Sequence, residues 1–280
     1  MIIVVPVVNN PDFIEIQYAC LKKHMKSAYE YVVFNDAKDF PDFTNGGDLS
    51  LRQQIRDTCT RLGVLCVEIP NAYHEQLKNV SVRAEHSFNF ILEFMKRYPQ
   101  KYLILDSDMF PVADFSEEDY AAYDAAVVLQ KRAEIVYFWH GVCYMDMLRM
   151  KNQELLNWDQ TPGTDTGGSM QAWLLRQAVG GTPDTDLIRR STEQYTGDGL
   201  YYIRHLWSCS WDASELPDRL KGQLQEFLER DPRNKDGKYF CELYDGRFLH
   251  YRAGCNWLGE GLELHRRLTA ELKRVLIECE

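Results

Sequence analysis

Long hydrophobic runs are missing from this sequence of 280 residues. The apolar run over residues 2–8 contains Pro6 and ends at the turn-forming Asn9-Asn10-Pro11. No other run approaches the roughly 20 residues that span a bilayer. A secretory signal would also need a charged start, a longer apolar segment and a small-residue cleavage site. We therefore expect a soluble, cytoplasmic protein.

Positive charge is also scarce. The chain has 32 Lys and Arg against 42 Asp and Glu, so its formal net charge is −10. No cluster of basic residues indicates a membrane surface, and proteins that bind nucleic acid usually carry a basic patch. A nucleic-acid partner is therefore not expected. With 45% hydrophobic and 26% charged residues, the chain has the balance of a folded globular protein.

The C-x-x-C pairs of zinc ribbons and redox motifs are absent as well. The cysteines are instead scattered singly through the chain, which is typical of small buried side chains in a reducing compartment. They are Cys20, Cys59, Cys66, Cys143, Cys209, Cys241, Cys255 and Cys279.

The first hundred residues alternate between short apolar runs and amphipathic segments. The apolar runs predict buried strands, and the segments with apolar residues three and four apart predict helices. Such an alternation favours an α/β fold with a mostly parallel sheet flanked by helices on both faces. The expected strands are Ile2–Val8, Tyr31–Phe34, Val64–Ile69 and Tyr102–Leu105. Three helices are expected. The first is Asp12–His24 with Asp12 as its cap, the second starts at a capping box of Ser50 and Gln53 and ends at Gly63, and the third is Ser81–Tyr98.

The second part of the chain is less regular, and nothing in it suggests a linker or a repeat. We expect a single domain over 1–280, with one half at 1–110 and the other at 111–280. Its predicted elements are strands Ala125–Gln130 and Val136–Met145, a loop Leu155–Thr166, a short helix Gly168–Ala178, a polar loop Gly180–Gly199, a helix Leu216–Arg230, a hairpin of Phe240–Tyr244 and Arg247–Tyr251 around Asp245-Gly246, and a C-terminal helix Leu262–Cys279.

Two D-x-D patterns occur, and roughly one is expected by chance in a chain of this size. Asp184-Thr185-Asp186 lies in a polar loop and predicts a solvated turn. Asp106-Ser107-Asp108 directly follows a predicted buried strand, where two carboxylates are unfavourable unless a cation meets them. Hard oxygen ligands suit Mg²⁺ or Mn²⁺. We therefore predict a metal site at Asp106 and Asp108.

Five segments in this order resemble the sequence blocks of GT-A-fold glycosyltransferases of the D-x-D type. They are VVPVVN, FNDA, SVRAEHSFNFILEFMKRYPQKYLILDSDMFP, VYFWHGVCYMDM and FLHYRAGCNW, which together span residues 2–257. The resemblance implies a Rossmann-like, mostly parallel central sheet flanked by helices, with a smaller mixed sheet on the acceptor side. It makes 1–110 the nucleotide-binding half and 111–280 the acceptor-binding half with the C-terminal helix. The soluble glycosyltransferases of large DNA viruses and bacteria are similar in general shape.

The resemblance also implies roles for individual residues. His250 would join Asp106 and Asp108 as the third protein ligand of the metal, although a lone His is often only a structural hydrogen-bonding residue. Arg83 would face the nucleotide or its phosphates. The alternative role of Arg83 is to form a salt bridge on the surface. The other residues expected to bind the nucleotide sugar are Pro6, Val7, Asn9, Asp36, Asp106, Ser107, His140, Gly141, Arg252 and Asn256.

An inverting transferase needs a carboxylate that removes the proton of the acceptor hydroxyl. Asp165 precedes a predicted helix in the loop at residues 163–168, where inverting enzymes of this family often place their base. Its alternative role is a helix N-cap, and Asp146 and Glu134 are rival bases. The residues that could line an acceptor cleft are Trp158, Trp207 and Trp211.

The predicted function is transfer of a sugar from a nucleotide-diphosphate donor to a hydroxyl of a glycan, assisted by Mn²⁺ or Mg²⁺. UDP with xylose, glucose or galactose is the favoured donor, and inversion is the favoured outcome. The alternative functions are a retaining glycosyltransferase and a non-catalytic glycan-binding protein on the same fold. A haloacid-dehalogenase phosphatase would need Thr or Val in place of Phe110, and a nucleotidyltransferase would need a Gly-rich loop with a Lys after the first strand.

Overall fold

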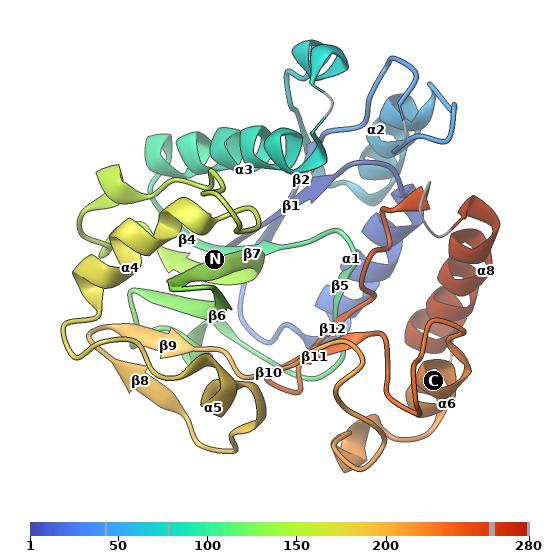
Figure 1. Ribbon diagram of the computed structural model, residues 1–280. Helices are drawn as coiled ribbons and strands as arrows, with labels where there is room; N and C mark the ends of the chain where they lie inside the picture. The colour runs from blue at the N-terminus through green and yellow to red at the C-terminus, as the bar shows by residue number, and fades with distance from the viewer. Residues whose placement is uncertain (43, 78, 258–260, 279–280) are drawn as a thin grey trace.

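The computed structural model describes residues 1–42, 44–77, 79–257 and 261–278, which form two sheets and their covering helices (Figure 1). The larger sheet has eight strands in the order β3-β2-β1-β4-β7-β6-β9-β8, and the smaller has four in the order β10-β11-β12-β5. The strands are β1 (Ile2–Val7), β2 (Glu30–Asn35), β3 (Leu65–Glu68), β4 (Lys101–Leu105), β5 (Met109–Pro111), β6 (Ala125–Arg132), β7 (Ile135–Asp146), β8 (Tyr195–Gly197), β9 (Leu200–Tyr202), β10 (His205–Leu206), β11 (Glu242–Tyr244) and β12 (Phe248–His250).

The first four strands of the large sheet are parallel, as the alternation of the sequence predicts. Strand β1 pairs with β2 and β4, and β2 pairs with β3. Beyond β4 the sheet continues with antiparallel β7 and β6. The expected α/β architecture with a second, smaller sheet is confirmed, although the pairings of the smaller sheet are all antiparallel rather than mixed. Ligands of such folds bind where parallel strands end, which here is beyond β1 and β4.

Helices cover both faces of the large sheet (Figure 1). Because side chains alternate along a strand, Val4 of β1 belongs to the core cluster that includes α3 and α4, whereas Ile3 and Val5 belong to the cluster that includes α1, α2 and part of the smaller sheet. The helices are α1 (Pro11–His24), α2 (Leu51–Leu62), α3 (Val80–Arg97), α4 (Gln171–Gln177), α5 (Thr185–Arg190), α6 (Gln223–Arg230) and α8 (Leu262–Lys273).

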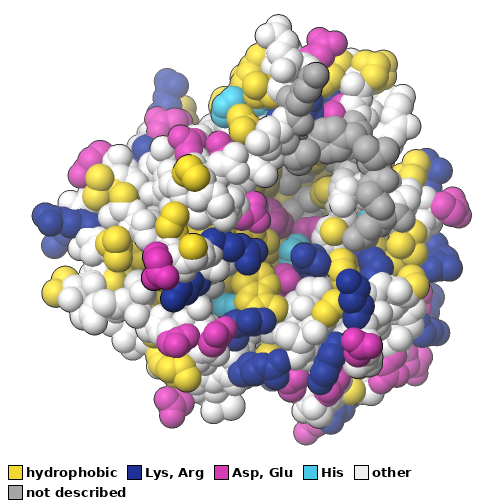
Figure 2. All heavy atoms as spheres, viewed as in Figure 1, with side chains coloured by type: hydrophobic (Ala, Val, Ile, Leu, Met, Phe, Trp, Pro, Cys, Tyr) yellow, Lys and Arg dark blue, Asp and Glu magenta, His cyan; other side chains and the backbone are white. Residues whose placement is uncertain are grey.

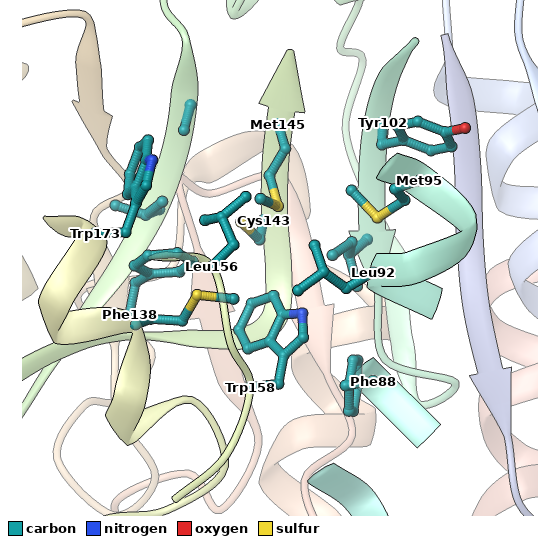
Figure 3. Packing of buried hydrophobic residues seen from close by; sticks show 14 of the residues in the cluster. Phe88, Leu92, Met95, Tyr102, Phe138, Cys143, Met145, Leu156, Trp158 and Trp173 are labelled. Carbon is teal, nitrogen blue, oxygen red and sulfur yellow. The ribbon is translucent and has the colours of Figure 1, made fainter. Parts of the chain in front are cut away.

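Large aromatic side chains fill the core between α3, α4 and the sheet (Figure 3). The ring of Trp158 lies 5.8 Å from that of Phe88 on α3 and 5.5 Å from that of Phe138 on β7. Trp158 and Trp211 are both fully buried, so neither lines an acceptor cleft, contrary to that expectation.

Helix ends differ in detail from the sequence predictions. Asn10 rather than Asp12 caps α1, because its side chain accepts a hydrogen bond from the N–H of Asp12 and Pro11 takes the first helical position. The capping box at Ser50 is not formed, since the Ser50 hydroxyl donates to Asp48 instead. Gly63 ends α2 in the left-handed conformation, as predicted.

The second half departs further from the predictions. The segment expected to be a polar loop, residues 180–199, contains α5 and β8. The helix expected over 216–230 begins only at Gln223, because Gly222 before it has a φ of 96°. The predicted hairpin turn is confirmed, with φ of 50° at Asp245 and 63° at Gly246. Helix α8 ends at Lys273 and continues as a π-helical turn to residue 278, so the predicted end at Cys279 lies outside the described residues.

The cysteines that the structure describes are all free thiols, and four of them, Cys20, Cys59, Cys143 and Cys241, are buried. This agrees with their interpretation as small apolar side chains. Within the described ranges, every helix is too short or too polar to cross a membrane.

Candidate active site

The D-x-D segment joins the two sheets. It leaves β4 at Asp106, whose N–H donates to the carbonyl of Gly141 at 2.9 Å. It then enters β5, which pairs with β12 so that Met109 lies opposite His250. This register brings His250 beside residues that precede it by more than a hundred positions in the chain.

Asp106, Asp108 and His250 form one compact group of ligand atoms. One carboxylate oxygen from each Asp and one imidazole nitrogen lie within 4.8 Å of one another, the only such group of three or more found among the described residues. The Nε2 atom of His250 is 3.3 Å from Oδ1 of Asp108, and the N–H of Gly254 donates to Oδ2 of Asp108 at 2.8 Å. Two carboxylates and an imidazole are a suitable donor set for a divalent cation.

Burial shapes the charges of this group. It raises the pKa of Asp106, and the nearby carboxylate of Asp108 adds to the rise against the opposing effect of His140. Burial acts in the same direction on Asp108, but His250 and the N–H of Gly254 outweigh it and lower the pKa. For His250, burial lowers the pKa, but Asp108 and Glu242 outweigh it and raise the pKa to about 10. The buried carboxylates therefore favour a neighbouring cation, and a divalent metal fits this chemistry.

Glu242 supports the metal-ligand group through His250 and was not among the predicted site residues. Its Oε2 is 2.9 Å from Nδ1 of His250 and accepts a hydrogen bond from the Tyr244 hydroxyl at 2.8 Å. This contact leaves Nε2 of His250 directed at Asp108. Counting back from the Asp245-Gly246 turn would have found the residue, because Glu242 lies directly opposite His250 in the hairpin.

A bulge in β7 brings two predicted residues to the site. Val127 pairs with Cys143, but Val128 pairs with Trp139, so residues 140–142 are unpaired with β6. The bulge directs His140 towards the D-x-D segment, with Nε2 3.7 Å from Oδ1 of Asp106. At Gly141 a Cβ atom would lie 1.9 Å from the indole ring of Trp139, so only glycine leaves room for that ring.

Two cavities meet at His250, which lines both. The first cavity, of about 490 Å³, lies at the ends of β1, β2 and β4. The predicted residues that line it are Pro6, Asp36, Arg83, Asp106, Ser107, Asp108, His140, His250 and Asn256, and Lys38, Ser87, Phe88 and Cys255 are further lining residues that the sequence did not indicate.

Asp36 and Arg83 both have protein partners on the wall of the first cavity. The Asp36 carboxylate accepts hydrogen bonds from Lys38 at 2.6 Å, Asn71 at 2.7 Å and Ser87 at 2.7 Å. The Arg83 guanidinium donates to both carboxylate oxygens of Asp42, at 2.7 and 2.8 Å. Each side chain is thereby fixed in position. The ion pair of Arg83 is mostly buried rather than on the surface.

Val7 and Asn9 do not line the first cavity, contrary to expectation. Val7 is buried in the core under the sheet. Asn9 is fully buried, and its amide donates to the carbonyls of Thr44 at 2.8 Å and Cys255 at 2.9 Å. Asn9 therefore ties the end of β1 to the loop after β12.

The second cavity, of about 810 Å³, extends from His250 across the ends of β6 and β12. The predicted residues Asp165, Trp207 and Arg252 line it. Arg252 therefore lies on this side of the group rather than in the first cavity, with Nε 3.6 Å from Oε1 of Glu242.

Asp165 is not a helix cap, because Gly167 takes that position. Its carboxylate accepts a hydrogen bond from the N–H of Thr166 at 2.8 Å. Asp165 lines the same cavity as His250, a member of the metal-ligand group.

The rival carboxylates lie elsewhere. Asp146 pairs with Lys101, at the opposite end of β4 from Asp106, and Glu134 is exposed in the turn between β6 and β7. In the second D-x-D pattern, Asp184 caps α5 by accepting from the N–H of Asp186, whose carboxylate lies 3.4 Å from Arg189. That pattern is a helix start rather than a simple turn.

No protein-family model and no curated protein sequence matches the chain. Three similar solved structures are of glycosyltransferases. The apo structure of the bifunctional enzyme WbbM shares 14% identity over 54% of this chain and 31% of that chain, with a TM-score of 0.34. An active-site mutant of LgtC shares 11% identity over 55% of this chain and 61% of that chain, with a TM-score of 0.35.

The third structure is the galactosyltransferase LgtC in complex with donor and acceptor sugar analogues. It shares 12% identity, and the alignment covers 97% of this chain and 95% of that chain, with a TM-score of 0.44. In the first two comparisons, the chain spans less than two thirds of the known protein.

Proposed function

We propose that the protein is a metal-dependent glycosyltransferase that moves a sugar from a nucleotide-diphosphate donor to a hydroxyl of a glycan. One observation carries this proposal: Asp106, Asp108 and His250 converge where two cavities meet. A transferase needs two substrates that approach one reacting carbon from different sides, and this arrangement supplies a place for each.

The first cavity suits the donor. It lies at the carboxyl ends of parallel strands, where nucleotides bind in such sheets, and its volume is in the range of small-ligand sites. Asp106, Asp108 and His250 would hold Mn²⁺ or Mg²⁺, with Glu242 fixing the imidazole. When bound, the cation neutralises charge on the diphosphate leaving group. UDP is the favoured nucleotide, with xylose, glucose or galactose as the sugar.

The second cavity suits the acceptor, and Asp165 on its wall is the proposed base. There the carboxylate would take the proton from the acceptor hydroxyl as that oxygen attacks the sugar, which inverts the anomeric carbon. His140, 3.7 Å from Asp106, would contact the donor sugar on the other side of the group.

Substitution of the base tests this assignment. Asp165→Asn should lower sugar transfer by about 10²- to 10⁴-fold and leave the affinity for the donor unchanged, as measured by calorimetry. Glu134→Gln, in an exposed turn, is the control and should transfer normally. Normal transfer by the Asp165→Asn variant would show that Asp165 is not the base, and a product that keeps the donor's anomeric configuration would assign a retaining mechanism instead.

Slow hydrolysis of the donor tests the function itself. The purified protein, given Mn²⁺ and a panel of UDP- and GDP-sugars, should release the free nucleotide from one or a few donors, and a chelator should stop the release. If no donor is hydrolysed, and neither UDP nor GDP raises the melting temperature in the presence of metal, the protein is not this transferase. Binding of glycans without any such release would identify a glycan-binding protein.

A further inference from the structure

The wall of the second cavity carries an excess of positive charge. Figure 2 shows Lys and Arg side chains gathered around the hollow at the middle of this face. Five cationic residues line the cavity against three carboxylates, although the chain as a whole has a net charge of −10. The cations are Lys131, Arg132, Arg189, Lys235 and Arg252, and the carboxylates are Asp165, Asp186 and Glu242.

The carboxylates neutralise this charge only in part. Asp186 lies 3.4 Å from Arg189 and Glu242 lies 3.6 Å from Arg252, but Glu242 is also bonded to His250 and Tyr244. In the part of the chain that the structure describes, neither Lys131 nor Lys235 has an ion-pair partner, and both side chains are exposed.

The cations come from separate parts of the chain. Lys131 and Arg132 end β6, Arg189 lies on α5, Lys235 lies in the loop before β11, and Arg252 follows β12. Like charges brought together by folding repel one another. A cleft lined by charges of one sign concentrates ligands of the opposite sign and raises their rate of association.

Aromatic rings hold two of the guanidinium groups in place. Arg189 lies over the ring of Trp207 at 5.7 Å, and Arg252 lies over the ring of Phe240 at 5.0 Å. Such contacts use the flat face of the guanidinium. The N–H groups at its edge are the ones that pair with carboxylate or phosphate oxygens. These four residues therefore form a pre-organised wall for an anion next to the metal-ligand group.

We propose that the second cavity selects an anionic acceptor, a glycan that carries a carboxylate or a phosphate close to the hydroxyl that receives the sugar. The role of the bound glycan as an acceptor rests on the proposed function, whereas the preference for anions rests on the cavity alone. The volume of about 810 Å³ fits a small ligand or the end of a longer glycan.

Binding of short glycans to the full-length protein tests the preference, with neither donor nor metal present. The probes are maltotriose, which is neutral, trigalacturonate, which carries carboxylates, and a phosphorylated maltotriose. Calorimetry at low salt should show at least one anionic probe binding about tenfold tighter than maltotriose, and added salt should reduce the difference. The tighter of the two anionic probes identifies the anion. Equal affinities for all three would overturn the proposal.

Charge-removing variants locate the binding. Lys131→Gln combined with Lys235→Gln should weaken the preferred anionic probe about tenfold and leave maltotriose unaffected, whereas Arg at both positions should keep tight binding. Lys151→Gln removes one charge from an exposed position outside the cavity and is the control. If the control loses as much affinity as the double variant, or if the double variant loses none, the cavity is not the site. Melting temperatures confirm that each variant is folded.

The outcomes also separate this inference from the proposed function. Donor hydrolysis together with equal binding of neutral and anionic glycans would reject the anionic acceptor and leave the transferase intact. Selective binding of the anionic glycan without hydrolysis of any donor would reject the transferase and keep the anion site. Tighter binding of a short oligonucleotide than of either anionic glycan would assign the basic wall to nucleic acid and overturn the proposal.

Discussion

At the scale of single residues, burial decides which D-x-D pattern carries chemistry. Asp106 and Asp108 follow a buried strand, and their ligand oxygens lie within 4.8 Å of each other and of His250, whereas Asp184 satisfies a helix N-terminus and Asp186 pairs with Arg189. In the sequence, only the preceding strand separates the two patterns. The family resemblance implied His250 as the third ligand, and the register of β12 with β5 explains its place beside Asp108.

Other residues of the site could not be predicted because their roles depend on tertiary contacts. Lys38 lies two residues after Asp36 and looks exposed in the sequence, yet it is buried and bonded to the Asp36 carboxylate. Burial lowers the pKa of this lysine in spite of the ion pair. Val7 and Asn9 were predicted to bind the nucleotide sugar, but Val7 packs in the core and the Asn9 amide donates to the carbonyl of Thr44 in a neighbouring loop.

Glu242→Gln tests the support of His250 by the hairpin. The amide keeps the shape but not the charge, so His250 should be held less firmly, and the affinity for Mn²⁺ should fall about 10- to 100-fold. The Mn²⁺ concentration that gives half-maximal nucleotide release measures the change.

Tyr244→Phe is the matched control for Glu242→Gln, because it removes the other hydrogen bond to the same oxygen of Glu242 and keeps the carboxylate. It should leave the requirement for Mn²⁺ nearly unchanged. The account of Glu242 is wrong if both variants have the same effect or if neither changes the Mn²⁺ requirement.

At the scale of elements, the strands and helices of the first half follow from their apolar patterns, but their irregularities do not. The residues of β7 predict a strand, and its bulge at residues 140–142 arises from pairing with β6 and from the indole of Trp139 over Gly141. Likewise, α5 and β8 lie in a segment whose polar residues suggested a loop. Their apolar residues Ile188 and Tyr195 pack against the core of the large sheet, a contact that no local pattern indicates.

Gly141→Ala tests the bulge. The added methyl group would meet the Trp139 ring and force it to move, so the free energy of unfolding should fall by about 1–3 kcal/mol and donor hydrolysis should fall as well. Gly197→Ala, in β8, is the control, since a Cβ there meets no atom within 4 Å. Urea denaturation of both variants measures the difference, and equal stabilities would contradict the close packing of Trp139 on Gly141.

Asp245 in the turn between β11 and β12 gives the hairpin a dependence on pH. Burial raises its pKa from 3.8 to about 6 in spite of hydrogen bonds from Tyr201 and from the N–H of Arg204. Between these two values the folded state binds more protons than the unfolded state, so the contribution of Asp245 to stability falls as pH rises. Above about pH 6 the stability lost through Asp245 no longer changes with pH.

Asp245→Asn removes this titration and keeps a residue type that tolerates the positive φ. Relative to the wild type, the variant should gain stability of the order of 1 kcal/mol as pH rises from 4 to 6, with no further gain above that range. Urea denaturation at several pH values measures the gain. A difference between the two proteins that does not change with pH would contradict the raised pKa.

At the scale of the whole molecule, the sequence predicts a parallel sheet with a polar edge but not how the chain returns to that edge. The pairings of β1 with β2 and of β2 with β3 join strands that follow one another along the chain, whereas β4 pairs with β1 rather than with β3. The pairing of β5 with β12 joins segments more than a hundred residues apart, and no local pattern indicates it. That pairing completes the metal-ligand group and places one cavity on either side of it.

The most direct test of the central claim compares the two D-x-D patterns in one assay. Asp108→Ala removes a buried member of the metal-ligand group and should lower metal-dependent nucleotide release by about a hundredfold or more. Asp186→Ala removes a carboxylate that is 82% exposed, and it should release nucleotide within about twofold of the wild type. Equal losses in the two variants, or full release by Asp108→Ala, would contradict a metal site at Asp106, Asp108 and His250.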